Sequence, residues 1–171
     1  LTLPIPDEYQ VTPSSFIFSY NNSYKYNDMK VAILIPTKNR PEFIKRSVLY
    51  YNSMKCNHTI YIGDASDSEI SKNILSFLKG INNVCVKYYH WESLGTAPTI
   101  GKLAEEACAT NDYCAYSGDD DYLIPSSLTK CADFLSKNPD YRTAQGRAVL
   151  VSMDKPEPIC SIEGISQYWG K

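Results

Sequence analysis

The sequence predicts an α/β fold in which helices flank a mostly parallel sheet. Two observations lead to this prediction. Short apolar runs alternate four times with helical apolar stripes across short connections, and the first of these runs is apolar without interruption. Strands of a parallel sheet are buried on both faces and therefore read as continuous apolar runs. Strand–helix alternation with short connections is typical of a parallel sheet covered by helices.

The expected elements follow one another from residue 31 onward. Pro36 ends the first apolar run, and Pro41 can occupy the first turn of the helix that follows. The expected strands are residues 31–35, 59–62, 84–89 and 113–117, with one more at 148–152. The expected helices carry apolar stripes at Ile44, Val48 and Tyr51; at Ile70, Ile74, Phe77 and Leu78; at Ile100, Leu103, Ala104, Ala107 and Cys108; and at Leu128, Cys131, Ala132 and Leu135.

Length and composition suggest one domain preceded by an arm. Residues 1–29 are rich in Tyr, Ser, Asn and Pro without a clear period, so we expect an irregular arm with a short strand at 16–18. Residues 30–171 have room for one hydrophobic core.

Charge and cysteine usage exclude several classes of protein. A net charge of −2 provides no basic surface for nucleic acid. No apolar run approaches the roughly 20 residues of a membrane span. Six cysteines without a C-x-x-C pair favour a reduced, cytoplasmic setting.

Three consecutive carboxylates, Asp119–Asp121, follow the expected strand 113–117. Carboxylates at the carboxyl end of a parallel strand are suited to hold a divalent cation, Mg²⁺ or Mn²⁺, that carries a phosphorylated ligand. The alternative is an acidic turn in which Asp119 or Asp120 caps the next helix.

Polar residues also follow the first two strands. The segment 36–40, Pro-Thr-Lys-Asn-Arg, follows the first, and Asp64 and Ser66 follow the second. Because carboxyl ends of parallel strands share one sheet edge, these groups can converge with the acidic triplet. Asp64 can accept from a base N–H or a ribose hydroxyl, or it can form only an Asx-turn. Neither G-x-G-x-x-G, G-x-x-x-x-G-K-[ST] nor G-x-S-x-G occurs.

Three segments carry a resemblance to a known family. Residues 31–41 resemble the apolar strand and P-T-x-N-R of family-2 glycosyltransferases of the GT-A fold. Residues 61–66 are similar to the family's V-D-D-G-S segment, with Asp64 on its second Asp, and residues 113–125 resemble its D-x-D segment with a later proline. The resemblance covers residues 30–150 and implies a GT-A, nucleotide-diphospho-sugar transferase type of fold, truncated in its acceptor half.

The resemblance also implies a set of site residues. Thr37 and Asp64 line the nucleoside pocket, and Asp119 and Asp121 form the D-x-D pair, so that one lies near the ribose and one binds the metal. Counting back from Pro125 instead places the first Asp on Gly118 and the second on Asp120, so all three carboxylates are candidate metal ligands. The full set expected to bind the donor is Pro36, Thr37, Asn39, Arg40, Asp64, Ser66, Lys102, Asp119 and Asp120.

The chain departs from the family pattern in three places. Lys38 stands where the family has an aromatic residue for base stacking, and Lys102 stands where it often has Asn. The general base of the family is a downstream Asp or Glu, which we expect beyond Lys171. Glu163 is the late candidate within the chain, although a surface role suits it better.

The expected function is metal-dependent, inverting transfer of a sugar of the hexosyl type from a nucleotide-diphosphate sugar to a saccharide or other hydroxyl acceptor. Two alternatives remain open. A sugar nucleotidyltransferase would have a Gly-rich basic loop after the first strand, and residues 36–41 contain no Gly. A non-catalytic nucleotide- or metal-binding module of the receiver type would have acidic residues there instead of Pro36 and Thr37.

Overall fold

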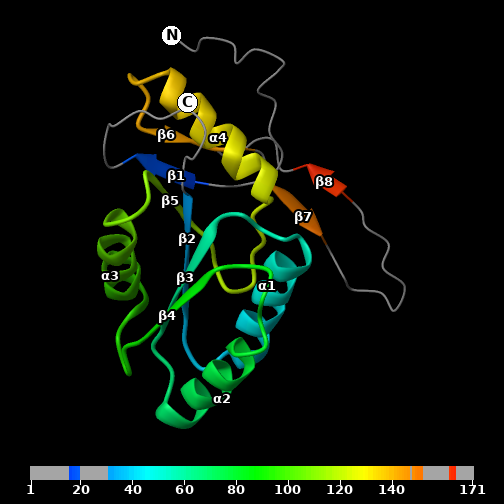
Figure 1. Ribbon diagram of the computed structural model, residues 1–171, viewed down its shortest axis with the longest axis vertical. Coiled ribbons are helices and arrows are strands. Elements are labelled where there is room, and N and C mark those ends of the chain that lie inside the picture. Colours follow the sequence, from blue (N-terminus) through cyan, green and yellow to red (C-terminus); the bar gives the residue numbers. More distant parts are fainter. Residues whose placement is uncertain (1–15, 20–30, 147, 152–161, 165–171) are drawn as a thin grey trace.

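The computed structural model describes residues 16–19, 31–146, 148–151 and 162–164, and its centre is a six-stranded sheet (Figure 1). The strand order is β4-β3-β2-β5-β1-β6. The strands are β1 (Phe16–Ser19), β2 (Val31–Thr37), β3 (Thr59–Asp64), β4 (Val86–His90), β5 (Tyr113–Tyr116) and β6 (Thr143–Ala144). Four neighbours, β4, β3, β2 and β5, are parallel, whereas β1 pairs antiparallel with both β5 and β6. The sheet is therefore mostly parallel, as predicted.

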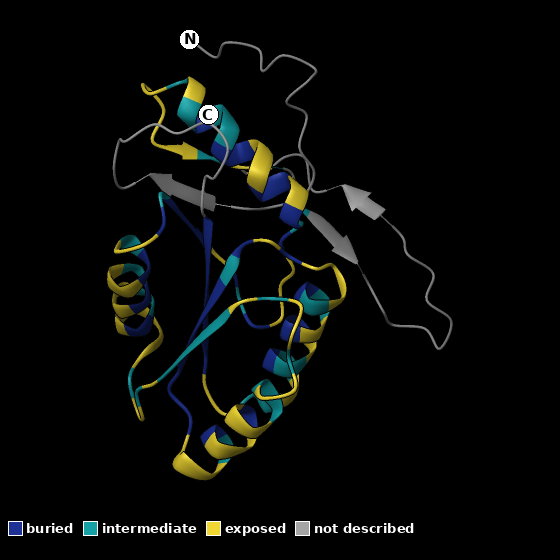
Figure 2. Cartoon of the chain, in the orientation of Figure 1, coloured by how far each residue is buried: buried dark blue, intermediate teal, exposed yellow. Residues whose placement is uncertain are grey.

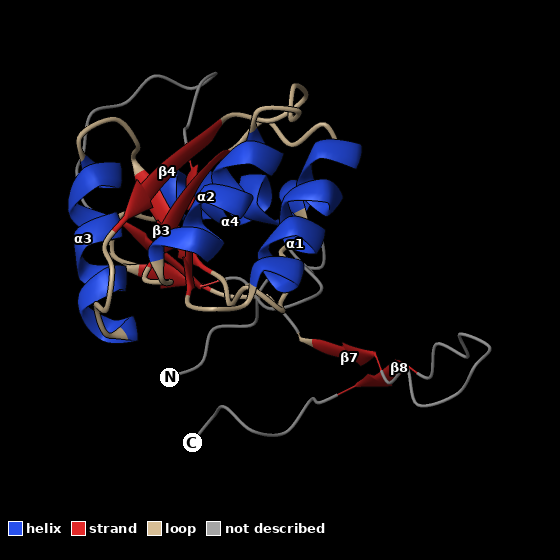
Figure 3. Ribbon diagram, turned by 90° about the horizontal axis from the view of Figure 1, so that it is seen from below, coloured by secondary structure: helices blue, strands red, loops and turns tan. Residues whose placement is uncertain are grey.

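Helices cover both faces of this sheet. The helices are α1 (Pro41–Ser53), α2 (Ser68–Leu78), α3 (Thr96–Cys108) and α4 (Pro125–Lys137). Helix α3 lies on one face, and α1, α2 and α4 lie on the other (Figures 1 and 3). A separate antiparallel pair, β7 (Val149–Val151) and β8 (Ile162–Gly164), follows α4 in the chain.

The core lies on both sides of β2. All seven residues of β2 are buried, and Figure 2 shows the central strands as the most buried part of the sheet. Alternate β2 residues face two clusters: Ile33 and Ile35 pack towards α1, α2 and α4, whereas Ala32 and Leu34 pack towards α3. Parallel register then aligns Thr37 with Asp64, so the polar residues of β2 and β3 leave the sheet at one edge.

The expected strands and helices are confirmed with small shifts at their ends. Strand β4 begins at Val86 rather than residue 84, because its pairing with β3 begins at the Ile60–Val86 pair. Strand β5 ends at Tyr116 rather than residue 117. Residues 16–19, within the segment expected to be an irregular arm, contribute β1 to the sheet. Within the described ranges, none of the helices has both the length and the apolarity needed to cross a bilayer.

We expect Gly63→Ala to destabilise the fold, because Gly63 of β3 lies directly under α3. A Cβ at this position would overlap the Thr99 methyl group and approach Leu103 Cδ1 to 3.0 Å. Overpacking of this kind costs about 1–3 kcal/mol of unfolding free energy, to be measured by urea denaturation. Gly101→Ala is the control, since nothing lies within 4 Å of its Cβ. Equal stability of the two variants would contradict this packing.

Candidate functional site

A cavity of about 280 Å³ opens at the carboxyl ends of β2 and β5. Its lining combines charged, polar and apolar residues. The lining residues are Pro36, Thr37, Lys38, Arg40, Ala65, Leu94, Thr96, Thr99, Tyr116, Gly118, Asp119 and Asp120. The loops that follow two neighbouring parallel strands thus meet the first turn of α3, which is where ligands bind in sheets of this type.

A buried hydrogen bond joins the ends of β2 and β5. The Thr37 hydroxyl donates to Asp119 Oδ2 at 2.7 Å, and the two residues are 82 positions apart in the sequence. Asp119 is only 4% exposed. A carboxylate so deeply buried requires hydrogen-bond donors or an opposite charge.

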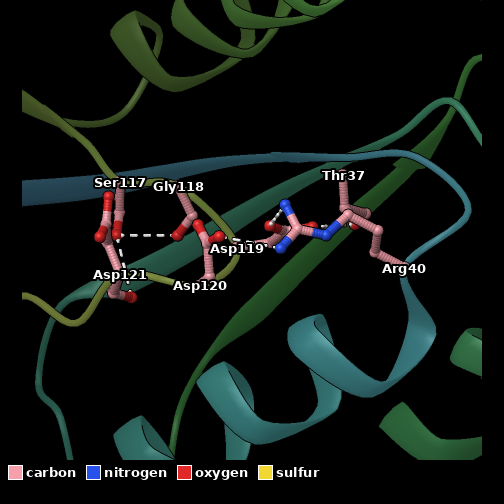
Figure 4. A network of polar contacts seen from close by, with 7 residues as sticks. All are labelled: Thr37, Arg40, Ser117, Gly118, Asp119, Asp120 and Asp121. Carbon is pink, nitrogen blue, oxygen red and sulfur yellow. Dashed lines mark hydrogen bonds and ion pairs between the residues drawn. The ribbon is translucent and has the colours of Figure 1, made fainter. Parts of the chain in front are cut away.

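Arg40 supplies that opposite charge. One guanidinium nitrogen lies 2.9 Å from Asp119 Oδ1 and the other lies 2.8 Å from Asp120 Oδ2. The guanidinium carbon lies 3.9 Å from the centre of the Phe43 ring, a cation–π contact that helps to hold it in place. Figure 4 shows Arg40 beside Asp119 and Asp120, with Asp121 at the far end of the network near Ser117. One cation therefore bridges two adjacent carboxylates.

The two carboxylates differ in acidity. Burial raises the pKa of Asp119, although the Thr37 hydrogen bond and the Arg40 charge act in the opposite direction. The hydrogen bond from Arg40 lowers the pKa of Asp120, which is half-exposed. The same hydrogen bond is the main reason why the pKa of Arg40 is raised.

Gly118 begins the turn that carries the acidic triplet. A Cβ on Gly118 would lie 3.0 Å from Asp120 Oδ1 and 3.0 Å from Asp121 Oδ2, so the absence of a side chain makes room for both carboxylates. The Asp121 backbone bonds within the turn, since its carbonyl accepts from the Ser117 hydroxyl at 3.4 Å. Asp119 and Asp120 line the cavity and Asp121 does not.

Asp64 lies in a second network behind the cavity wall and is fully buried. The Ser66 backbone N–H donates to its Oδ1 at 2.8 Å, which is the Asx-turn left open by the sequence. The Tyr88 hydroxyl donates to its Oδ2 at 2.5 Å and also contacts the Ser71 hydroxyl. Both carboxylate oxygens are therefore engaged by the protein.

Asn39 and Ser66 connect the loops after β2 and β3. The Asn39 backbone N–H donates to the Ser66 hydroxyl at 2.7 Å, and the Asp67 N–H donates to Asn39 Oδ1 at 3.1 Å. Asn39 has a φ of 54°, in the left-handed region that Asn tolerates better than most residues. These two residues hold the loops beside the cavity and do not line it.

The two lysines singled out from the sequence lie in different places. Lys38 is exposed and lines the cavity. Lys102 does not line it: its ammonium lies 5.2 Å from the centre of the Trp91 ring. A role for Lys102 in donor binding stays a prediction.

Several lining residues were not anticipated from the sequence. Tyr116 is 37% exposed at the end of β5 and adds an aromatic ring to the wall. Thr96 and Thr99 come from the first turn of α3, and Leu94 precedes that helix. The place of Tyr116 near the carboxyl end of the expected strand 113–117 was a usable signal, whereas the angle at which α3 begins could not be inferred from sequence.

The donor set fits a divalent cation only together with a ligand. Among residues 16–19, 31–146, 148–151 and 162–164, no three His, Cys, Asp or Glu side chains are grouped as a metal cluster. Asp119 and Asp120 nevertheless offer carboxylate oxygens at the cavity wall. Mg²⁺ usually takes one or two protein carboxylates together with substrate phosphates, so two carboxylates are sufficient.

The family of the chain follows from residues 32–157, which match the family described as glycosyl transferase family 2. The chain belongs to this family. The match contains residues 32–41 of the first motif segment, the other two segments, and all the residues that line the cavity. It confirms the resemblance read from the sequence and the GT-A type of fold.

Comparison with solved structures and curated proteins adds little beyond this. The chain is similar to a crystal structure of S. aureus TarS 1–349, with 18% identity and a TM-score of 0.49 over 65% of this chain. The aligned part spans about a third (33%) of that TarS chain. The comparison with curated proteins finds no match.

We expect Tyr88→Phe to destabilise the protein, because the buried Asp64 carboxylate would lose the donor at its Oδ2. A buried carboxylate left with an unmatched oxygen costs about 1–3 kcal/mol, measurable by urea denaturation. Tyr122→Phe is the matched control, since that ring is 42% exposed. Stability unchanged in Tyr88→Phe would show that the Asp64 network does not depend on the phenol.

We expect the two cavity carboxylates to titrate on opposite sides of the usual Asp pKa of 3.8, Asp119 above it and Asp120 below it. Arg40→Gln should raise both pKa values, because Arg40 lowers each of them. The lowered pKa of Asp120 contributes to folding stability above pH 3.8, and this contribution is lost as the pH falls through that pKa. The raised pKa of Asp119 contributes to folding stability below pH 3.8, and this contribution is lost as the pH rises through that pKa.

Carbon-detected NMR titration of the side-chain carboxyl groups measures both values. Lys45→Gln is the control, because Lys45 pairs with Glu42 on α1 and contacts neither carboxylate. An Asp119 that titrates below Asp120 would refute the assignment.

Proposed function

We propose that the chain is the donor-binding part of an inverting glycosyltransferase that uses a divalent metal, Mn²⁺ or Mg²⁺. The enzyme transfers a sugar of the hexosyl type from a nucleotide-diphosphate sugar to a saccharide or other hydroxyl acceptor. The observation that carries this proposal is the Thr37–Asp119–Arg40–Asp120 network, which lies in the cavity of a chain belonging to glycosyl transferase family 2.

The lining of the cavity supports a ligand with an apolar part and an anionic part. Pro36, Leu94 and Tyr116 provide the surface on which a flat base or a ribose can pack. Lys38 and Arg40 add positive charge within reach of a diphosphate. The Tyr116 ring offers the aromatic contact that Lys38 cannot supply at the position where the family has an aromatic residue.

The carboxylates divide two tasks. Asp119 is buried and held by Thr37, so it is suited to fix the position of a hydroxyl or of the second carboxylate. Asp120 is half-exposed and has a lowered pKa, so it stays ionised and can serve as a metal ligand at neutral pH. A bound divalent cation would neutralise the charge that develops on the departing nucleoside diphosphate.

In this proposal Asp64 acts from behind the wall of the cavity. Its oxygens accept from the Ser66 N–H and the Tyr88 hydroxyl, and the Ser66 contact fixes the turn that presents Ala65 to the nucleoside pocket. The general base for the acceptor hydroxyl is proposed to lie outside the cavity, in the acceptor half. Glu163, the candidate from the sequence, belongs to β8, outside the main sheet.

Titration with UDP, GDP and CDP and with their sugar conjugates, with and without Mn²⁺, tests the proposal. We expect at least one nucleotide to bind in a metal-dependent way. Asp120→Asn should weaken that binding by about tenfold or more, since loss of one charged contact costs ~1.5–3 kcal/mol. Isothermal calorimetry gives both affinities.

Two further variants sharpen the result. Asp133→Asn is the control, because Asp133 lies on α4 and pairs with Lys137. Asp121→Asn separates the two readings of the motif, and we expect a smaller loss than for Asp120→Asn because Asp121 does not line the cavity. Absence of nucleotide binding under every metal condition would overturn the proposed function.

A further inference from the structure

We propose that Arg40 is a built-in counter-cation that competes with the divalent metal for Asp119 and Asp120, so that the metal binds tightly only when a donor diphosphate draws Arg40 away. This inference deepens the proposed function and rests on it. It assigns to Arg40 the coupling between metal binding and donor binding.

The geometry places a cation where the metal ligands are. Each carboxylate gives one oxygen to a separate nitrogen of the same guanidinium, at 2.9 Å for Asp119 and 2.8 Å for Asp120 (Figure 4). The contact with Asp120 is a charge-assisted hydrogen bond and the contact with Asp119 is an ion pair, and hydrogen bonds between ionised groups are stronger than those between neutral groups. A metal ion that takes the same two oxygens must therefore displace Arg40 or lie beside a positive charge.

Charge makes the metal alone a weak competitor. Asp119, Asp120 and Arg40 together carry a single net negative charge. The electrostatic attraction of a divalent cation to this group is weaker than its attraction to the two carboxylates alone. If the cation took the carboxylates while Arg40 stayed at the site, the guanidinium would repel the cation. Burial of Asp119 strengthens the effect, because water screens the pair less at 4% exposure.

Arg40 can leave its position without disrupting the core. Its side chain is 41% exposed, and the residue precedes Pro41 at the start of α1. The guanidinium also lies over the face of the Phe43 ring. A diphosphate in the cavity would offer oxygens that the guanidinium binds as well as it binds carboxylates. Donor binding thereby frees Asp119 and Asp120 for the metal.

Thermodynamic linkage makes this coupling reciprocal. If a nucleotide raises the affinity for the metal by a given factor, the metal raises the affinity for the nucleotide by the same factor. In this arrangement Arg40 sets that factor. Removal of Arg40 should therefore strengthen metal binding in the absence of nucleotide and reduce the coupling.

The experiment measures free Mn²⁺ by electron paramagnetic resonance, first with Mn²⁺ alone and then with the nucleoside diphosphate that binds best. For Arg40→Gln without nucleotide we expect a Kd for Mn²⁺ at least about tenfold lower than for the unmodified chain. We also expect the nucleotide to enhance Mn²⁺ binding at least about fivefold less in the variant than in the unmodified chain.

Arg46→Gln is the matched control. Arg46 stacks on the same Phe43 ring, with its guanidinium carbon 4.6 Å from the ring centre, but no ion pair joins it to Asp119 or Asp120. The substitution removes the same charge, and we expect less than about a twofold change in Mn²⁺ affinity, because the exposed Arg46 acts on Asp120 only weakly, through its charge, and solvent screens it. Equal tightening in both variants would overturn the proposal, because any nearby positive charge would then have the same effect.

Arg40→Lys covers the case in which Arg40→Gln fails to fold. A lysine ammonium is a point charge with three rotatable donors and does not reproduce the fixed, planar fork of a guanidinium. We therefore expect Mn²⁺ alone to bind this variant about threefold or more tightly than the unmodified chain. Unchanged Mn²⁺ affinity in the folded Arg40 variants overturns the inference, even if metal-dependent nucleotide binding supports the proposed function. If no nucleotide binds, the proposed function fails, and the Mn²⁺ affinities alone decide whether Arg40 competes for the carboxylates.

Discussion

Burial of β2 on both of its faces is the constraint on which the rest of the structure depends. The strand is paired with β3 on one side and β5 on the other, and helices cover it above and below. No polar side chain can be accommodated along it until Thr37, where the chain leaves the sheet. The polar groups of the site are therefore confined to the loops at one edge. Gly63 adds to this constraint, because α3 approaches β3 closely at that point.

The second consequence of this burial is electrostatic. Asp119 follows β5 and is held under the loop that follows β2, where little water reaches it. Its carboxylate is tolerable there because Thr37, at the end of β2, supplies a hydrogen bond, and Arg40, in the loop that follows β2, supplies a positive charge. The same contacts join β2 to β5 across 82 positions of sequence. The link between the two loops and the charge at the cavity wall therefore depend on the same few atoms.

The sequence was sufficient for most of the fold because its local signals agreed with one another. Continuous apolar residues at 31–35 predicted a strand buried on both faces. The apolar stripe of Ile44, Val48 and Tyr51 predicted α1, and all three of these side chains are fully buried. Strand ends were less accurate, because they depend on the partner strand: β4 begins where its pairing with β3 begins. The short strand at 16–18, which is β1, was anticipated. Its antiparallel place between β5 and β6 could not be anticipated, because it depends on pairing with residues far along the chain.

For the site, the sequence by itself determined which chemical groups gather at the sheet edge: Thr37, Arg40, Asp64 and the acidic triplet all follow apolar runs, and parallel strands bring such positions together. Only the tertiary structure decided how these groups divide. It brings Asp119 and Asp120 to the cavity, leaves Asp121 outside the cavity lining, and buries Asp64 with its carboxylate on Tyr88. The physical reason is that the direction of a side chain in a turn depends on contacts made with residues far along the chain. The pairing of Arg40 with Asp120, 80 positions apart, leaves no trace in local sequence pattern.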